Sequence, residues 1–286
     1  MATPRGQGMR DILLYLTDDG HEADHIAATV ALAEAQGARL TGLAVAEPLA
    51  AHAEYLPPEA LSRYREAWQT RNARLQRRFD AGVAHSALTT EWRSVEDLRV
   101  DRAVVDVVAM QARYADLLVM GQVDPDRPAD LIAADLPGQA AVIAGRPVLA
   151  LPYAWTPRPI GQRVIIGWDG ERESARAVAD ALPLLRAADW VQVLNIDTGP
   201  GGRRLAADLP GADMAAHLAR HGVAVEAAHS SADIPLADAL LSAVADADAD
   251  LLVMGAYGRS RFREMILGGT TRRMLREMTV PVLLSH

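Results

Sequence analysis

The chain of 286 residues contains no cysteine. This absence excludes disulfide frameworks, thiolate zinc sites, iron–sulfur clusters and cysteine nucleophiles. Aromatic residues are also scarce, with five Trp and two Phe scattered along the chain, and they offer no stacking platform for single-stranded nucleic acid. The net charge of −8 argues against a globally basic nucleic-acid binder, so we expect no nucleic acid among the partners.

Long hydrophobic runs are missing as well. No uncharged run approaches the roughly 18 residues that a membrane-spanning helix requires. The first ten residues, MATPRGQGMR, lack the apolar core of a secretory signal peptide. Half of the residues are apolar and 23% are charged, which is usual for a globular protein. We therefore expect a cytoplasmic protein that does not associate with membranes.

An internal repeat organises the chain. The heptapeptide ADLLVMG occurs at residues 115–121 and again, 134 positions later, at 249–255. At the same offset, PVL at 147–149 matches PVL at 281–283. An identical heptapeptide in register with a second match indicates that one domain has been duplicated.

Each repeat alternates short apolar runs with segments of helix length. Runs such as Ile12–Leu16 and Val164–Trp168 are almost continuously apolar, which is typical of strands buried on both faces of a sheet. Ala-rich segments at 22–36 and 173–187 follow them and read as helices. Strands separated by helices require right-handed crossovers and a parallel sheet covered on both faces. The sequence therefore predicts an α/β fold with two domains, each built on a five-stranded parallel sheet.

The domain boundaries follow from this alternation. We expect a first domain over 9–153, a second domain over 163–286, and a linker over 154–162, where two prolines interrupt any periodicity. The third strand of each domain is the weakest prediction, near 84–93 and near 223–229.

A ligand of an open parallel sheet binds beyond the carboxyl ends of the strands, where the strand order reverses. In the second repeat, Asp169-Gly170 ends the first strand, as Asp19-Gly20 does in the first repeat. Residues 255–270 then form a loop with four glycines, which let backbone amides approach an anion. A helix that starts near Thr270 would add unpaired amides and the positive end of its dipole.

The first repeat differs at this loop. It keeps Gly121 in place of Gly255, but Gly258, Gly268, Gly269 and Thr270 become Asp124, Ala134, Asp135 and Leu136. Residues 255–276 hold six arginines and one glutamate, whereas residues 121–142 hold one arginine and four aspartates. The local charge is thus +5 in the second repeat and −3 in the first. A polyanion such as the phosphates of a nucleotide is expected in the second repeat alone; the alternative is a loop whose arginines are simply solvated.

The stretch Gly255-x2-Gly258-x9-Gly268, followed by a small residue, resembles the nucleotide-binding motif of the universal stress protein family, G-x2-G-x9-G-[S/T]. The resemblance extends to Asp169 after the first strand and to the closing V-P-V-L strand, and it covers both repeats. The chain is thus similar to a tandem universal stress protein. The resemblance implies a Rossmann-like, five-stranded α/β fold of the adenine nucleotide alpha hydrolase-like type in each repeat, with ATP bound by some members.

The resemblance also implies roles for individual residues. Asp169 and the backbone of Ile196 are expected to hold adenine and ribose. The residues expected around the phosphates are Gly255, Gly258, Arg259, Gly268, Gly269 and Thr270. Gly269 stands where the family has Ser or Thr, so Thr270, one place on, is expected to replace part of the missing hydroxyl. The expected cofactor is ATP or a related adenine nucleotide, accompanied by Mg²⁺ and not covalently bound.

Dimerisation through the last strand is a further implication of the resemblance. Here the strands at 147–151 and 281–285 are expected to pair within one chain, as an intramolecular pseudo-dimer. Assembly of the chain into homodimers and the identity of protein partners stay open.

These features together predict a stress-response regulatory protein with a nucleotide in its second domain and a degenerate, structural first domain. The loop shows no arranged base or carboxylate pair, so efficient catalysis is not expected, although slow ATP hydrolysis stays open. An interaction module of the same fold that binds no nucleotide is the alternative, and the glycine at position 269 favours it.

A zinc-dependent hydrolase is a remote alternative. His21, Glu22 and His25 fit H-E-x-x-H, in which two zinc ligands lie one helical turn apart and a glutamate serves as base. The context argues against a metal site, because the segment directly follows a turn after a parallel strand and no extension with a third histidine ligand follows.

Overall fold

The computed structural model describes residues 8–46, 57–96, 103–123, 135–198, 211–258 and 269–286. These residues alternate strands and helices in both halves of the chain. The first half contains β1 (Asp11–Tyr15), α1 (Glu22–Gln36), β2 (Arg39–Val45), α2 (Pro58–Val83), β3 (Thr90–Val95), α3 (Val104–Ala112), β4 (Leu117–Gly121), α4 (Leu136–Ala144) and β5 (Val148–Leu151). The second half contains β6 (Arg163–Gly167), α5 (Arg172–Leu185), β7 (Trp190–Thr198), α6 (Ala212–Arg220), β8 (Val225–Ala232), α7 (Leu236–Asp246), β9 (Leu251–Gly255), α8 (Gly269–Glu277) and β10 (Val282–Ser285).

The strands form one continuous sheet in the order β3-β2-β1-β4-β5-β10-β9-β6-β7-β8. Within each half all pairings are parallel and the order is the same, with the first strand in the middle. The halves join where β10 pairs antiparallel with β5, and Leu283 lies opposite Leu149. The predicted α/β fold and the predicted pairing of the two closing strands are both confirmed.

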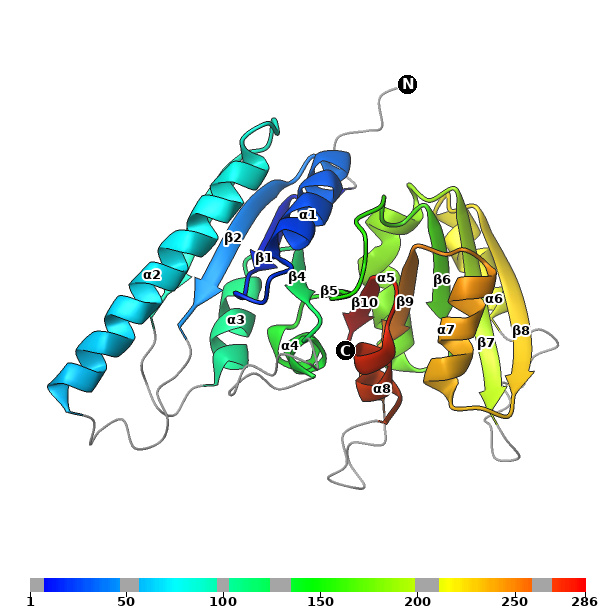
Figure 1. The fold of residues 1–286 in the computed structure, drawn as a ribbon. Coiled ribbons are helices and arrows are strands. Elements are labelled where there is room, and N and C mark those ends of the chain that lie inside the picture. The colour runs from blue at the N-terminus through cyan, green and yellow to red at the C-terminus, as the bar shows by residue number, and fades with distance from the viewer. Residues whose placement is uncertain (1–7, 47–56, 97–102, 124–134, 199–210, 259–268) are drawn as a thin grey trace.

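Two apolar cores lie on the two faces of this sheet. In β4, Leu117 and Val119 belong to one core and Leu118 and Met120 to the other, because successive side chains of a strand point to opposite faces. Helices α1, α2, α5 and α6 cover one face, and α3, α4, α7 and α8 cover the other (Figure 1). Burial on both faces explains why the strands are almost continuously apolar.

The third strand of the first half lies further along the chain than the sequence predicts. Helix α2 runs on to Val83, so β3 covers Thr90–Val95 and not 84–93. In the second half, β8 extends from Val225 to Ala232. The residues of the expected linker, 154–162, contain neither helix nor strand, and the domain boundaries themselves stay a prediction. Among the described helices, none has both the length and the apolar character needed to cross a membrane.

The two Asp-Gly pairs that follow the first strands are not equivalent. The backbone N–H groups of Leu16 and Trp168 donate matching hydrogen bonds to the second strand of each half, 2.9 Å long in both. The next residue is Thr17 in the first half and Asp169 in the second. Counted from the strand, Asp19 therefore lies two residues beyond the counterpart of Asp169, although each aspartate accepts the N–H of the second residue after it in a turn that leads into the next helix.

Candidate functional site

A cleft of about 390 Å³ opens at the carboxyl ends of β6, β7 and β9. In the sheet β6 lies between β7 and β9. The chain leaves β6 toward β7 on one side and later returns to β9 on the other, so the cleft lies where the strand order reverses. The volume is within the range of about 300–1,000 Å³ that small-molecule sites occupy.

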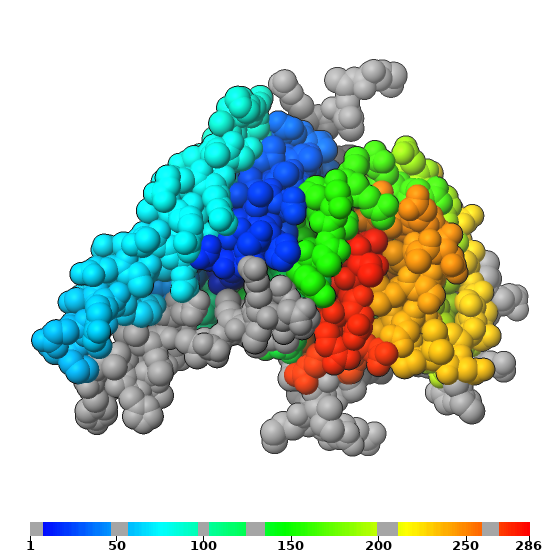
Figure 2. All heavy atoms as spheres, viewed as in Figure 1, coloured from blue at the N-terminus to red at the C-terminus, as the bar shows by residue number. Residues whose placement is uncertain are grey.

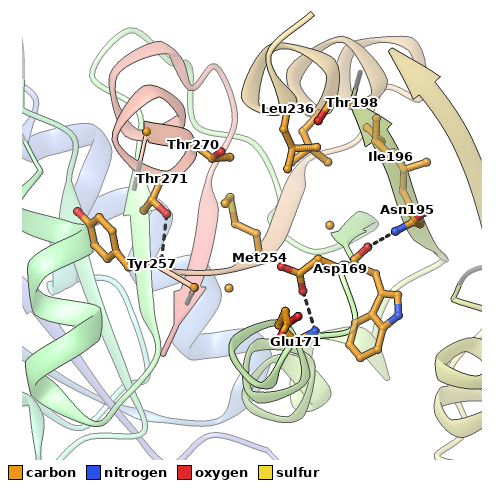
Figure 3. A pocket seen from close by; sticks show the side chains of 17 residues that line it. Asp169, Glu171, Asn195, Ile196, Thr198, Leu236, Met254, Tyr257, Thr270 and Thr271 are labelled. Atoms are coloured by element: carbon orange, nitrogen blue, oxygen red, sulfur yellow. Dashed lines mark hydrogen bonds between the residues drawn. The ribbon is translucent and has the colours of Figure 1, made fainter. Parts of the chain in front are cut away.

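Six of the eight residues that the sequence analysis assigned to a site line this cleft: Asp169, Ile196, Gly255, Gly258, Gly269 and Thr270. The other two, Arg259 and Gly268, lie outside the described residues. Figure 3 shows Asp169 and Ile196 on one side, Thr270 on the other, and the Met254 side chain between them. The fold thus brings together residues that are up to 101 positions apart in the chain.

The end of the cleft near Asp169 is held by backbone hydrogen bonds. Oδ1 of Asp169 accepts the N–H of Glu171 (2.9 Å), in a turn that leads into α5. The Asn195 amide donates to the carbonyl of Trp168 (2.9 Å) and pairs through Oδ1 with Nδ1 of His229 (3.0 Å). This network fixes the backbone immediately before Asp169.

The opposite end of the cleft is the start of α8. Gly269, Thr270 and Thr271 all line the cleft, so the helix begins at its wall. The first N–H groups of a helix have no partner within it and carry the positive end of its dipole. Thr271, which the sequence analysis did not single out, accepts the N–H of Tyr257 on its hydroxyl oxygen (3.1 Å; Figure 3).

The glycines of the loop differ in how closely other atoms surround them. A Cβ on Gly255 would come within 2.7 Å of the backbone nitrogen of Ser174, so this glycine allows β9 and α5 to pack closely. A Cβ on Gly258 would meet only Oε2 of Glu173, at 3.9 Å, and a Cβ on Gly269 would meet no described atom within 4 Å. Among the described residues, the surroundings of Gly258 and Gly269 therefore leave space for a small side chain.

The arginines contribute less charge to the cleft than the sequence suggests. Three of the six lie among the described residues, and each faces a carboxylate: Arg272 with Asp135 (3.5 Å), Arg273 with Asp238 (2.6 Å) and Arg276 with Glu277 (2.9 Å). Hydrogen bonding and attraction to Asp238 raise the pKa of Arg273, which stays charged. The local charge of +5 therefore overstates the positive electrostatic field in the cleft, because a count of charged residues does not show which side chains are paired.

Sequence analysis also missed most of the apolar wall. Leu194, Leu236, Leu240 and Met254 line the cleft, but they lie in the same strand and helix patterns as the core and carry no signal of their own. Gly167 at the end of β6 was detectable, since the first repeat has a tyrosine, Tyr15, at that position.

The H-E-x-x-H segment serves the packing of the first half. His25 is buried, and a Cβ on Gly121 would touch its ring at 2.4 Å. Burial lowers the pKa of His25, and Glu22 forms an ion pair with Arg78. Among the residues that the structure describes, no group of three or more His, Asp or Glu side chains is placed to hold a metal ion. The zinc-hydrolase alternative therefore gains no support from these residues.

The strand order defines a doubly wound α/β protein with a cleft of about 390 Å³ where that order reverses. Residues 161–286 match the model of the universal stress protein family. A universal stress protein of Archaeoglobus fulgidus DSM 4304 has the same fold over 96% of this chain and 95% of its own, with a TM-score of 0.70 at 16% identity. A functionally unknown protein of Pseudomonas aeruginosa PAO1 has a TM-score of 0.58 at 16% identity, covering 98% of this chain and 93% of its own.

A shorter match is closer in sequence. Universal stress protein Slr1230 of Synechocystis sp. (strain ATCC 27184 / PCC 6803 / Kazusa) is 53% identical over 34 residues, which is 12% of this chain and 12% of that protein. The match to the family model thus covers the second half of the chain, and the first half repeats the fold of the second with the same strand order.

Proposed function

We propose that the second half binds ATP or a related adenine nucleotide in the cleft, and that the chain acts as a stress-response regulator without efficient catalysis. The observation that carries this proposal is the convergence of Asp169, Ile196 and the glycine loop on one cleft, although they were selected from the sequence alone. A nucleotide needs an apolar wall for its base and amide donors for its phosphates, and the cleft offers both.

The two ends of the cleft fit the two ends of the ligand. Leu194 and Ile196 supply an apolar wall with backbone groups of β7 for the base, and the Asp169 carboxylate suits a ribose hydroxyl. Gly258 and the first turn of α8 face the other end, where a side chain at Gly258 would have open space. The phosphates would lie there, accompanied by Mg²⁺.

Efficient hydrolysis is not part of the proposal. The carboxylates among the described lining residues are Asp169 and Glu171, and both lie at the ribose end. At the phosphate end the described lining side chains are hydroxyls and a tyrosine, which cannot act as a general base near neutral pH.

A carboxylate introduced into the phosphate loop tests the proposal. Gly258→Asp gives the second repeat the residue that the first repeat has at this position, Asp124. A like charge about 5 Å from the phosphates costs about 3 kcal/mol at an effective dielectric constant of about 20, so we expect affinity for ATP to fall about 100-fold by calorimetry. Gly258→Ala, which adds a small side chain without charge, should lose much less.

The same titration separates the two candidate functions. An interaction module without nucleotide is favoured by Gly269, which removes a hydroxyl from the motif, and by the pairing of the α8 arginines with carboxylates. That function predicts no heat of ATP binding for wild type or variant, with or without Mg²⁺. Heat in the wild type that Gly258→Asp abolishes would exclude it.

A further inference from the structure

A buried hydrogen bond joins the cleft of the second half to the first half. The hydroxyl of Tyr257, in the loop that follows β9, donates to Oδ2 of Asp135 (3.1 Å), immediately before α4. Only 2% of Tyr257 and 4% of Asp135 is exposed. Gln139 donates to the other oxygen of the same carboxylate (2.6 Å), and Arg272 lies 3.5 Å from Oδ2. The carboxylate is therefore fixed from three sides.

The backbone of Tyr257 is in a conformation that a residue with a Cβ rarely adopts. Its φ is +49°, in the left-handed region, which is unfavourable for a residue other than glycine. Such a conformation persists only where the surroundings enforce it. The N–H of Tyr257 is held by Thr271 of its own half, and its hydroxyl is held by Asp135 of the other half. Tyr257 itself lines the cleft and leads directly into Gly258.

The contact between the halves leaves little room at this point. A Cβ on Gly138 in α4 would lie 2.6 Å from the hydroxyl oxygen of Tyr257, so α4 approaches as closely as a glycine allows. Helix α4 contacts α8. Figure 2 shows the red C-terminal segment between the green end of the first half and the orange part of the second half. A shift of α4 would therefore move Tyr257.

Asp135 also occupies a position of the repeat whose counterpart in the second half lies at the cleft. It stands where the second half has Gly269, the first residue of α8 at the wall of the cleft. A carboxylate at that position opposes phosphate binding in the first half. In this chain it turns across the interface and binds the loop of the second half.

We propose that Asp135 and Tyr257 are positioning residues for the second cleft, through which the first half holds residues 255–258 in the conformation that binds phosphate. This inference rests on the proposed function and adds regulation to it. ATP affinity in the second half depends on a side chain of the first half, and by linkage a bound nucleotide strengthens the contact between α4 and α8. A partner that separates α4 from α8 would release the nucleotide.

The test uses Tyr257→Phe, Asp135→Ala and the double variant in the full chain. Each single variant should weaken ATP binding about fivefold, the equivalent of one hydrogen bond, and the double variant should be no weaker than the worse single variant. Without ligand, amide hydrogen exchange of the peptide that contains residues 255–258 should be faster in every variant than in the wild type.

Gln122→Met is the matched control. Gln122 is buried and donates to the carbonyl of Arg276 (2.9 Å) across the same interface, but it is not among the residues that line the cleft. Its loss should lower the melting temperature and leave both ATP affinity and the exchange of 255–258 unchanged.

The inference is overturned if Tyr257→Phe behaves like this control, with a lower melting temperature but wild-type affinity and exchange. If Asp135→Ala does not fold, the comparison of Tyr257→Phe with Gln122→Met still tests the inference. A wild type that binds no ATP would overturn the proposed function, whereas the exchange measurement would still show whether the first half orders the loop.

Discussion

The two halves have the same scaffold and different cleft residues. Tyr15 and Gly167 occupy the same register, since each lies opposite a leucine of the next strand and a methionine of the LLVMG strand. Tyr15 is buried in the first half, whereas Gly167 leaves the second cleft open. Strand register and cleft lining are thus encoded by separate positions, and under the proposed function a few side chains at strand ends decide which half holds the nucleotide.

Other positions repeat this contrast. The counterpart of Asp169 is Thr17, and the counterpart of Asn195, which fixes the backbone before Asp169, is Ala44. At this strand register the first half therefore has a threonine in place of the carboxylate and an alanine in place of the asparagine. We regard the first half as a scaffold that supports the site of the second.

The largest expected effect comes from Gly167→Tyr, which copies the first half into the second cleft. A phenol ring at this position would fill the space of the base, so ATP affinity should fall by about 100-fold or more by calorimetry. The fold should persist, because a Cβ on Gly167 meets Leu240 and Met254 at ordinary contact distances of 3.4–3.7 Å.

The reciprocal change is the control. Tyr15→Gly should leave ATP affinity unchanged and destabilise the chain by about 3–5 kcal/mol, because it opens a cavity in a core. Unchanged affinity in Gly167→Tyr would mean that the ligand does not occupy this cleft.

A smaller effect distinguishes the halves by pH. Burial lowers the pKa of His25 below its ordinary value near 6.5, while Asp19 and Asp24 oppose the shift and His21 adds to it. Below pH 6.5 the unfolded chain therefore binds a proton that the folded chain resists, and stability is lost as the pH falls from 7.5 to 5.5. Ala177 occupies the corresponding helical position in the second half, so this acid sensitivity belongs to the first.

Thermal melts of His25→Gln measure this contribution. We expect the wild type to lose about 1 kcal/mol more than the variant over that pH range. The comparison with the variant is needed because burial raises the pKa of Glu22, whose protonation restores stability as the pH falls further. If stability depends on pH in the same way in the wild type and in the variant, His25 is not the source of the acid sensitivity.

The smallest expected effect is a gain in ATP affinity. Gly269→Ser restores the hydroxyl of the family motif, and no described atom lies within 4 Å of the new Cβ. One added hydrogen bond to a phosphate should tighten ATP binding about three- to tenfold, with Gly269→Ala as the control that adds a Cβ alone. A Ser variant equal to the Ala variant would show that the hydroxyl does not reach the ligand.

The architecture was predictable because it rests on local patterns. The repeated heptapeptide and the apolar runs predict the alternation of strands and helices, and Val148 and Val282 lie in the closing strands that pair as expected. The predicted start of β3 was wrong, because the segment between Val83 and Thr90 has no periodicity that marks where the strand begins.

The sequence also singled out six residues that line one cleft, but it did not predict the contacts within that cleft. The Thr271 hydroxyl serves the backbone of Tyr257, and Asp135 reaches that tyrosine from 122 positions away. Contacts of this kind depend on how α4 packs against α8, which no local pattern specifies. The same holds for the arginines of α8, whose partners come from other elements.

The order of the sheet has a consequence for synthesis of the protein. Strand β5 is complete at Leu151, but its neighbour β10 begins only at Val282, after the whole of the second half has been made. Throughout that interval a nascent first half would present an apolar strand with unpaired backbone groups, which is a template for aggregation. Chaperone capture during translation would therefore concentrate on this one strand.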